Sequence, residues 1–370
     1  MTKRAKLLII SVVGARPNFM KIAPFARALK RFPELFDHVL VHTGQHYDPG
    51  MSDSFFKALD IPEPDVDLGI GSGTHAEQVG RTMIAFEPVV RERSPDWIVV
   101  VGDVNATCAC SITARKEHVK LAHIEAGLRS FDQRMPEEIN RMVTDRLSDL
   151  LFTTDEIADA NLRNEGTAPD RIRRVGNIMI DTLEDNRQKA LALDIAGIVD
   201  SHRVDLRLTG SFKAHQDKYA VLTMHRPSNV DDRNVLGCLV DYLTRELPQT
   251  MPLVWTLHPR THKRLIEFGL WDSAVNADGV FLIEPVGYHE MLRLNLGARL
   301  MLTDSGGLQE ECCVAGTPCV TLRENTERPV TLAERGGLSV LAGNDPSAIR
   351  AAVETLLKRE RREFRPPLWD

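Results

Sequence analysis

Residues 97–127 read WIVVVGDVNATCACSITARKEHVKLAHIEAG. Two apolar runs, at residues 97–102 and 120–124, enclose a stretch at residues 105–116 that has the length and composition of a helix. Strands that are apolar on both faces and are connected through helices are typical of parallel sheets that helices cover on both sides. This segment therefore predicts an α/β architecture.

The same alternation continues along the whole chain. Further strands are expected at residues 7–13, 38–42, 150–152, 220–224, 253–257, 280–283, 299–302 and 318–322. Further helices are expected at residues 17–31, 76–91, 136–147, 232–243, 288–295 and 307–315. The alternation stops around residues 182–217, where a charged helical stretch precedes polar residues without a strand pattern. We expect the connection between two domains there.

The length of the chain supports two domains of comparable size. Its 370 residues compare with a typical domain of about 150 residues. We place the boundary near residue 177, which gives α/β domains at residues 1–177 and 178–370, and we expect two doubly wound sheets facing each other across a cleft. Ligands of such sheets bind beyond the carboxyl ends of the strands, so the loops that follow strands are expected to carry the chemistry.

Composition excludes several classes of protein. A formal net charge of −6 gives no basic surface for nucleic acid. The six cysteines include no CxxC pair and no zinc-like spacing, which predicts reduced thiols, no disulfide framework and no structural metal. The apolar run at residues 7–13 ends in a charged loop instead of a cleavage site, and no stretch approaches the roughly 20 apolar residues of a membrane span. We expect a soluble cytoplasmic protein.

Three carboxylates in the first half follow predicted strands or open a helix. Asp103 comes after residues 97–102, Glu125 ends the next strand, and Glu137 lies in the first turn of the helix at residues 136–147. Separately, Asp103 has an ordinary explanation as a helix cap and Glu137 as a first-turn acid, whereas the strand-end position of Glu125 favours a plain structural role less. Together, three acids at one sheet edge suit proton transfer, because mutual repulsion raises the pKa of at least one of them.

Cations accompany these acids. Arg16 and Lys21 follow the turn at Gly14, near the start of a helix whose backbone N–H groups favour anions. They predict phosphate or sugar contact, with a solvated basic turn as the alternative. Arg141 stands four residues after Glu137, a spacing that stabilises a helix through an ion pair.

The second half carries candidate groups for an anionic ligand. Ser305-Gly306-Gly307 opens a helix and would present N–H groups and a hydroxyl to a diphosphate. Glu311, one turn further, could accept hydrogen bonds from ribose hydroxyls, and Arg328 suits a diphosphate or a carboxylate. His225 directly follows residues 220–224. An ordinary glycine turn and a structural histidine are the alternatives.

Seven motifs occur in order along the chain. They are Gly14-Ala15-Arg16-Pro17-Asn18 with Lys21, Gly102-Asp103, His123-Ile124-Glu125-Ala126-Gly127-Leu128-Arg129, Pro136-Glu137-Glu138-Ile139-Asn140-Arg141, His225-Arg226, Ser305-Gly306-Gly307-Leu308-Gln309-Glu310-Glu311 and Thr326-Glu327-Arg328-Pro329. With these motifs the chain closely resembles the non-hydrolysing UDP-N-acetylglucosamine 2-epimerase family, from residue 7 to about 345. The resemblance implies the glycosyltransferase-B architecture, two Rossmann-like domains with a UDP-sugar in the cleft.

The resemblance also implies an activity, the interconversion of UDP-GlcNAc and UDP-ManNAc without NAD or metal. In this isomerase reaction UDP is eliminated and added back with inversion at C2. The N-terminal domain would carry the acid/base groups and the C-terminal domain would bind UDP. The implied catalytic residues are Asp103, Glu125, Glu137, Arg141 and His225. The implied substrate-binding residues are Arg16, Lys21, Asp103, Glu125, His225, Met291, Ser305, Gly306, Gly307, Glu311 and Arg328.

Several roles within this set follow from the resemblance alone. Arg141 would orient Glu137, and Met291 stands where relatives carry a phenylalanine beside uracil. Spacing leaves open which carboxylate is the base. A homodimer in the cytoplasm that supplies surface polysaccharide synthesis is implied. The alternatives are a 2-epimerase for a modified UDP-sugar such as a diacetamido uronic acid, a glycosyltransferase of the same architecture, and a catalytically silent nucleotide-sugar sensor.

Overall fold

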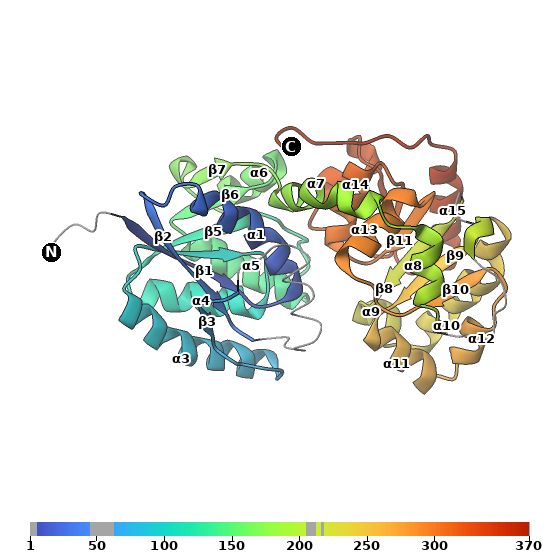
Figure 1. Ribbon diagram of the computed structural model, residues 1–370, viewed down its shortest axis with the longest axis horizontal. Helices are drawn as coiled ribbons and strands as arrows, with labels where there is room; N and C mark the ends of the chain where they lie inside the picture. The colour runs from blue at the N-terminus through green and yellow to red at the C-terminus, as the bar shows by residue number, and fades with distance from the viewer. Residues whose placement is uncertain (1–5, 45–62, 205–211, 216–217, 370) are drawn as a thin grey trace. The chain divides into compact units, whose positions relative to one another are not determined.

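The computed structural model describes residues 6–44, 63–204, 212–215 and 218–369 (Figure 1). The chain forms two compact units. The first consists of Met1–Thr182 together with Pro366–Asp370, and the second of Leu183–Arg365. Each contains a parallel sheet with helices on both faces, which confirms the predicted α/β fold of two doubly wound sheets.

Within its described residues, the first unit has a parallel sheet of seven strands in the order β3-β2-β1-β4-β5-β6-β7. The strands are β1 (Leu7–Val13), β2 (Phe36–His42), β3 (Val66–Asp67), β4 (Trp97–Val101), β5 (Lys120–Ala126), β6 (Leu150–Thr153) and β7 (Ile172–Arg174). The helices are α1 (Arg16–Lys30), α3 (His75–Arg93), α4 (Asn105–Lys116), α5 (Pro136–Leu147) and α6 (Glu156–Asn164).

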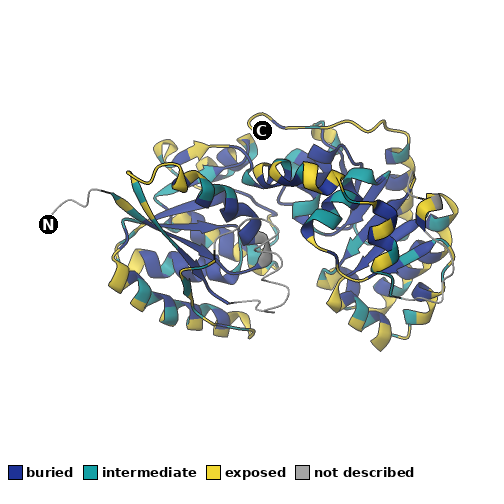
Figure 2. Ribbon diagram, viewed as in Figure 1, coloured by how far each residue is buried: buried dark blue, intermediate teal, exposed yellow. Residues whose placement is uncertain are grey.

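Strand β4 shows why this sheet is buried on both faces. Ile98 and Val100 pack with residues of α3 and α4, whereas Val99 and Val101 pack with residues of α1 on the opposite face. Successive side chains of a strand point to opposite faces, so a run of β-branched residues suits a position between two layers of helices. The strands are accordingly dark in Figure 2, where buried residues are drawn in blue.

Within its described residues, the second unit has a parallel sheet of six strands in the order β10-β9-β8-β11-β12-β13. The strands are β8 (Ala220–Met224), β9 (Leu253–Leu257), β10 (Val280–Ile283), β11 (Leu300–Thr303), β12 (Cys319–Thr321) and β13 (Ser339–Leu341). The α-helices that lie entirely in this unit are α8 (Ile195–Ser201), α9 (Pro227–Val230), α10 (Arg233–Asp241), α11 (Pro259–Glu267), α12 (Trp271–Val275), α13 (Tyr288–Gly297), α14 (Gly306–Ala315) and α15 (Pro346–Leu357). Its core also forms two clusters, one on each face of the sheet.

The ten predicted strands are all present, with some ends shifted by one or two residues. Strands β3, β7 and β13 have no counterpart among the predicted ones. Each has only two or three residues and lies at an edge of its sheet. Such a short strand lacks an apolar run that distinguishes it from a loop.

The units divide inside helix α7 (Ile178–Leu191), between Thr182 and Leu183, a few residues after the predicted boundary at residue 177. The segment expected to connect the domains instead contributes α8 to the second unit, because Ile198 and Val199 are buried in its core. Residues 205–211 and 216–217 of that segment lie outside the described part of the chain.

The predicted range 178–370 assigns the last residues of the chain to the second domain. In the structure these residues, Pro366–Asp370, belong to the first unit. Trp369 is only 1% exposed, and its indole Nε1 donates a hydrogen bond to the Thr154 carbonyl oxygen, 3.0 Å away. A Cβ at Gly176 would lie 1.7 Å from the Leu368 carbonyl oxygen, so only glycine lets the chain pass there. Burying a tryptophan stabilises the fold enough to explain this return. Among the described residues, no helix is both long and apolar enough to cross a membrane.

Candidate active site

Both sheets reverse their winding direction once, at the position where ligands of doubly wound sheets bind. The reversal lies between β1 and β4 in the first sheet and between β8 and β11 in the second. Lys21 lies on the helix that follows β1, Asp103 follows β4, and Glu125 lies near the end of β5. His225 follows β8 and Ser305 follows β11. The structure thus places these predicted residues at the carboxyl edges of the sheets.

Glu125 has a backbone conformation that directs its side chain. The pairing of β5 with β6 joins Ile124 to Phe152 and Ala126 to Thr153, so Glu125 is the extra residue of a β-bulge. Its φ of 73° is in the left-handed region, which a glutamate rarely adopts. Bulges next to active sites redirect side chains in this way. The buried carboxylate of Glu125 contacts the buried Lys21 ammonium.

Gly102 makes room for this ion pair. Its φ is 67°, and a Cβ there would lie 3.3 Å from Asn18 Nδ2, 3.3 Å from Lys21 Nζ and 3.6 Å from Glu125 Oε2. Both the backbone angle and the crowding require glycine. The Gly102–Asp103 turn therefore closes directly over Lys21 and Glu125.

Asn18 ties two of these loops together. Its side-chain oxygen accepts hydrogen bonds from the backbone N–H groups of Gly14 (3.2 Å) and Ala15 (3.0 Å). Its amide donates to the Val101 carbonyl oxygen at 2.9 Å. The turn before α1 is thus fixed to the end of β4. Arg16 begins α1, but its side chain lies outside the described part of the chain.

Arg141 joins two carboxylates. Its Nε and Nη2 donate to Asp103 Oδ2 at 3.0 and 2.7 Å, and its Nη1 donates to Glu138 Oε2 at 2.5 Å. Arg141 and Glu138 are buried, whereas the Asp103 side chain is 25% exposed. Asp103 is therefore the member of this triad that a ligand can reach.

Glu138 is a partner that the sequence analysis missed. Its carboxylate also accepts from the Ser130 backbone N–H and hydroxyl and from the Phe131 N–H, at 2.9 to 3.0 Å. Its three-residue spacing from Arg141 is as favourable as the four-residue spacing of Glu137, so the pattern contained the signal. Glu137 lies half-buried in the first turn of α5, and its orientation by Arg141 stays a prediction.

In the second unit, His225 is held by a buried acid. Its Nδ1 lies 2.9 Å from Asp304 Oδ1. Asp304 Oδ2 accepts from the backbone N–H groups of His225 (2.8 Å) and Arg226 (2.7 Å) and from Asn229 Nδ2 (3.0 Å). Burial alone would raise the pKa of Asp304, but His225 and the backbone donors outweigh it and hold the pKa below its ordinary value.

Asp304 and His258 are both absent from the predicted site. Asp304 directly follows β11, as Asp103 follows β4, so its position was a readable signal. The ring of His258, which follows β9, lies 4.9 Å from the His225 ring. His258 Nδ1 accepts from the Arg260 N–H at 3.1 Å, and burial followed by the charge of His225 lowers the pKa of His258 to about 4.

The start of α14 has the features of an anion site. Ser305 caps the helix without a side-chain hydrogen bond to it, and the first turn carries no acidic residue. A Cβ at Gly306 would lie 2.6 Å from Glu327 Oε1 and 2.8 Å from Arg328 Nη1, whereas one at Gly307 would meet nothing within 4 Å. The first backbone N–H groups of a helix favour a phosphate at such a place.

Arg328 packs against this helix start. Its Nε lies 2.9 Å from Glu310 Oε1 and its Nη1 lies 2.5 Å from Glu327 Oε1, and all three side chains are buried. Two carboxylates thus share its charge. Arg328 therefore packs closely against the Gly306 backbone, in addition to any contact with a ligand.

Glu311 and Met291 lie deeper in the second unit. Burial, followed by the charge of Glu310, raises the pKa of Glu311 to about 8, so its carboxyl can donate a hydrogen bond at neutral pH. The nearby Tyr288 hydroxyl is buried and has no hydrogen-bond partner among the described residues. Met291 is half-buried on α13 and packs against the adjoining core cluster.

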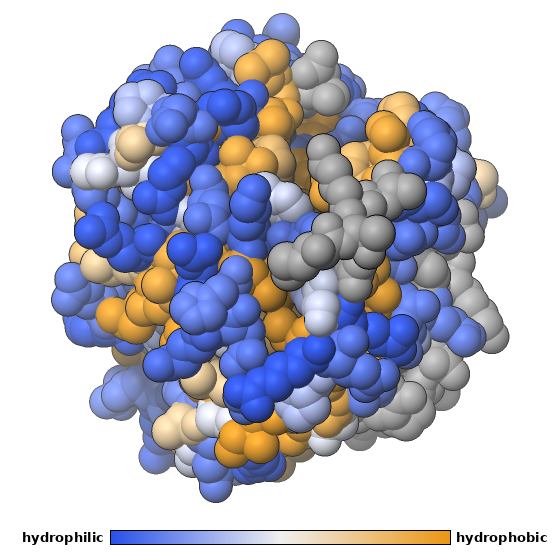
Figure 3. All heavy atoms as spheres, turned by 90° about the vertical axis from the view of Figure 1, so that its left-hand side faces the viewer, coloured by the Kyte–Doolittle hydropathy of each residue, from blue (hydrophilic) through white to orange (hydrophobic). Residues whose placement is uncertain are grey.

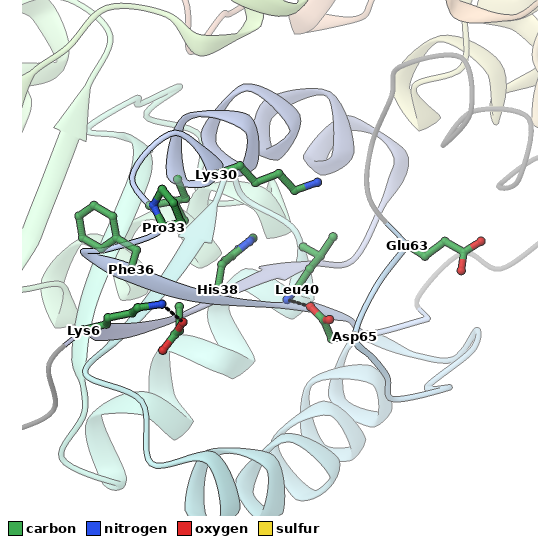
Figure 4. A pocket seen from close by; sticks show the side chains of 10 residues that line it. Lys6, Lys30, Pro33, Phe36, His38, Leu40, Glu63 and Asp65 are labelled. Carbon is green, nitrogen blue, oxygen red and sulfur yellow. Dashed lines mark hydrogen bonds and ion pairs between the residues drawn. The ribbon is translucent and has the colours of Figure 1, made fainter.

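A pocket of about 450 Å³ lies at the other edge of the first sheet (Figure 4). It is lined by His38 of β2, by Lys30 of α1 and by Asp65, among others. These residues lie near the amino-terminal ends of β1 and β2, away from the strand ends that carry Asp103 and Glu125. Among the described residues, no group of histidine, cysteine, aspartate and glutamate side chains is arranged to hold a metal ion.

Two doubly wound parallel sheets with charged groups at their carboxyl edges define a two-unit α/β enzyme of the glycosyltransferase-B type. The family model for UDP-N-acetylglucosamine 2-epimerase matches residues 27–370, and the chain belongs to this family.

Named relatives agree with this assignment. The UDP-N-acetylglucosamine 2-epimerase of Methanocaldococcus jannaschii is 41% identical over 352 residues, covering 95% of this chain and 92% of the relative. The crystal structure of the enzyme from that organism in complex with UDP-GlcNAc and UDP has a TM-score of 0.87 at 40% identity, covering 97% of this chain and 95% of that one. The UDP-2,3-diacetamido-2,3-dideoxy-D-glucuronate 2-epimerase of Pseudomonas aeruginosa is 40% identical over 321 residues, covering 86% of this chain and 84% of the relative.

Proposed function

We propose that this chain is an isomerase that interconverts UDP-N-acetylglucosamine and UDP-N-acetylmannosamine. The observation that carries the proposal is the group of acids and cations at one sheet edge, Glu125 with Lys21 and Asp103 with Arg141, in a chain of this family. A solved relative at 40% identity binds UDP-GlcNAc and UDP. An epimerase needs proton-transfer groups, which a glycosyltransferase of the same fold does not need in this number.

The reaction begins with elimination. A carboxylate takes the C2 proton, the C1–O bond to the diphosphate breaks, and the electrons of the C2–H bond form a C1=C2 double bond. UDP leaves with the electrons of the C1–O bond. The C2 proton is not adjacent to a carbonyl group and is weakly acidic, so departure of UDP has to drive the step. Donors that stabilise the negative charge on the leaving diphosphate therefore lower the barrier.

The second unit supplies those donors in this proposal. The Ser305 hydroxyl and the N–H groups of Gly306 and Gly307 bind the diphosphate, and His225 contributes an imidazole whose orientation Asp304 fixes. Arg328 adds positive charge, and Arg16 of the first unit adds to it. Glu311 binds the ribose hydroxyls, and Met291 packs near the uracil.

The first unit supplies the acid and base. Re-addition requires a proton on the opposite face of C2 while UDP returns to C1, so groups on both faces of the sugar take part. Asp103, Glu125 and Glu137 are the candidates. Lys21 fixes the Glu125 carboxylate and Arg141 fixes the Asp103 carboxylate before substrate arrives. In this division of labour the first unit carries the acid/base groups and the second binds UDP.

The test is incubation of the protein with UDP-GlcNAc in D2O, followed at C2 by NMR. We expect UDP-ManNAc to form with deuterium from solvent at C2. Exchange restricted to a diacetamido uronic analogue would assign the activity to that substrate instead. Sugar transfer to an added acceptor without exchange would identify a glycosyltransferase, and binding without reaction would identify a sensor.

We further propose a homodimer that acts in the cytoplasm and supplies surface polysaccharide synthesis. Figure 3 shows one face of the first unit, where apolar side chains gather between polar ones. Large apolar side chains such as Ile84 (74% exposed) and Phe131 (77% exposed) are available for contact with a second copy. The six cysteines are free thiols, five of them buried, which suits a reducing compartment. Sedimentation equilibrium tests the dimer, and cell fractionation tests the location.

A further inference from the structure

His123 is a buried titratable side chain to which the proposed reaction gives no role. It lies on β5, two residues before Glu125, and is fully buried. Its Nδ1 lies 2.6 Å from Asp145 Oδ1 of α5, and its Nε2 lies 2.9 Å from the Gly102 carbonyl oxygen. The ring therefore bridges α5 and the turn that carries Asp103.

Both partners of the ring accept hydrogen bonds. A carbonyl oxygen has no hydrogen to donate. Asp145 Oδ2 accepts from the Gly127 N–H (3.1 Å) and faces Arg129 Nη1 (2.7 Å). Burial alone would raise the pKa of Asp145, but His123 and Arg129 outweigh it and keep the pKa below its ordinary value, so Asp145 is ionised and only accepts.

A neutral imidazole has one N–H group and would turn a lone pair toward one of these two acceptors. The two hydrogen bonds form together only when both ring nitrogens carry hydrogen. Charged groups around the ring balance that positive charge. Arg129 also forms a bidentate pair with Glu165 at 2.7 Å. The positive charges of His123 and Arg129 are therefore balanced by the negative charges of Asp145 and Glu165. Burial of the charge is tolerated because this network is paired and hydrogen-bonded.

We propose that His123 is a buried imidazolium that positions the Gly102–Asp103 turn for the reaction. This inference rests on the proposed epimerase function. The Gly102 carbonyl is fixed by His123, while a Cβ at Gly102 would lie within 3.6 Å of Asn18, Lys21 and Glu125. This hydrogen bond thus fixes the orientation of the Gly102–Asp103 peptide group, which separates Asp103 from the Lys21–Glu125 pair. His123 touches no substrate and is a positioning residue.

The protonation state is tested by two-bond ¹H–¹⁵N correlation spectra of protein labelled with [¹⁵N]histidine. We expect both ring nitrogens of His123 to give protonated signals at the pH of the activity assay. The spectrum of H123Q assigns the signals. In D145N, one ring nitrogen of His123 is expected to lose its hydrogen. An unprotonated ring nitrogen in the wild-type protein would overturn the proposal.

Two substitutions test the positioning role. The amide nitrogen of a glutamine stands near the place of Nε2 and can still donate to Gly102, whereas that of an asparagine stands near Nδ1 and cannot. We expect H123N to lower kcat about 100-fold and H123Q to retain about tenfold more activity, with KM within about twofold in both, because a misplaced acid slows chemistry more than binding. Equal kcat values for the two variants would overturn the role.

The NMR spectra of His123 and the C2 exchange assay together distinguish failure of this inference from failure of the proposed function. If the wild-type protein shows no exchange at C2, the proposed function fails and the positioning role fails with it. If the wild-type protein is an active epimerase and its His123 ring is neutral, only the present inference fails. Circular dichroism of each variant confirms that it is folded.

Discussion

The charged side chains at the two carboxyl edges are each held by a buried group of opposite charge. Lys21 contacts Glu125, Arg141 contacts Asp103, and Asp304 contacts His225. A side chain that is held in this way loses its conformational freedom before the substrate arrives, which preserves the reacting geometry. Removal of a reacting acid is therefore expected to affect chemistry far more than nucleotide binding.

Glu125→Gln tests this expectation with a change that keeps the shape of the side chain. We expect UDP affinity within about twofold of wild type but C2 exchange slower by about 100-fold or more, because one of the proposed acid/base groups has been lost. Calorimetry with UDP and exchange in D2O measure the two quantities. Glu156→Gln, at an exposed position in the first turn of α6, is the matched control and should leave both unchanged. An unaltered exchange rate would remove Glu125 from the catalytic set.

Glu311 gives the protein a predictable dependence on pH. Burial, followed by the charge of Glu310, raises its pKa from 4.5 to about 8. Between these values the folded state keeps a proton that the unfolded state has released. Stability is thus fully retained below the unfolded pKa and falls by about 1.4 kcal/mol per pH unit until the folded pKa is reached.

Denaturant unfolding of the wild-type protein and of Glu311→Gln at pH 5.5 and 7.5 checks this dependence. The wild-type protein should lose stability over this interval relative to the variant, whose amide does not titrate. Parallel pH dependence of the two proteins would show that the Glu311 carboxyl titrates normally in the folded state.

Sequence patterns indicated some of these residues and contacts but not others, and the difference has physical reasons. Glu125 and His225 directly follow apolar runs, and parallel strands bring such positions to one edge. The choice between Glu137 and Glu138 as a partner of Arg141 depends on how α5 is rotated against its neighbours, which spacing alone does not fix. The contact of His123 with Asp145 joins residues 22 positions apart and depends on tertiary packing.

At the scale of elements, the start of α14 combines two glycines with different constraints. Gly306 is enclosed by Glu327 and Arg328, so a larger residue would displace buried charges. Gly307 has open space in front of it, which is where an anion bound to the helix N-terminus would lie. Both glycines belong to the predicted site, but only the structure distinguishes the one that is enclosed by charged side chains from the one that faces open space.

Gly307→Ala uses this difference. The added methyl group meets no protein atom, so we expect a folded protein that is slightly more stable, by about 0.5 to 1 kcal/mol, as for other glycines in helices. Affinity for UDP should fall by about tenfold, because the methyl group occupies space that a phosphate needs. Gly237→Ala in α10, also free of contacts, is the matched control and should gain stability without losing affinity. Equal UDP affinities in the two variants would place the diphosphate elsewhere.

The elements themselves were predictable where they are long. Helices α4 and α5 have the predicted bounds, and so do the strands β1, β8, β9 and β10. Each of these segments has a periodic or continuous apolar pattern and a clear start, such as Pro136 of α5. The edge strand β7 contains the sequence Ile172-Arg173-Arg174, in which one apolar residue is too few to indicate a strand. Its place is determined by pairing with β6.

At the scale of the whole molecule, the chain contributes to the first unit from both of its ends. A doubly wound unit is usually continuous in sequence, and the predicted domain ranges assumed this. Residues Pro366–Asp370 show no periodic apolar pattern that would assign them to either unit. A single tryptophan near a chain end is the local signal for this return, and its meaning depends on a surface 215 residues earlier, at Thr154.

Trp369→Ala should therefore destabilise the first unit by about 3 to 5 kcal/mol, the usual effect of truncating a buried aromatic side chain. Hydrogen exchange measured by mass spectrometry should show faster exchange in peptides that contain Thr154 and Gly176, which contact this segment. UDP affinity should change little, because all the proposed nucleotide contacts except Arg16 lie in the second unit. Leu368→Ala removes a neighbouring side chain that is 53% exposed and should change stability by about 0.5 kcal/mol or less. If the two variants are equally stable, Trp369 is not part of the core of the first unit.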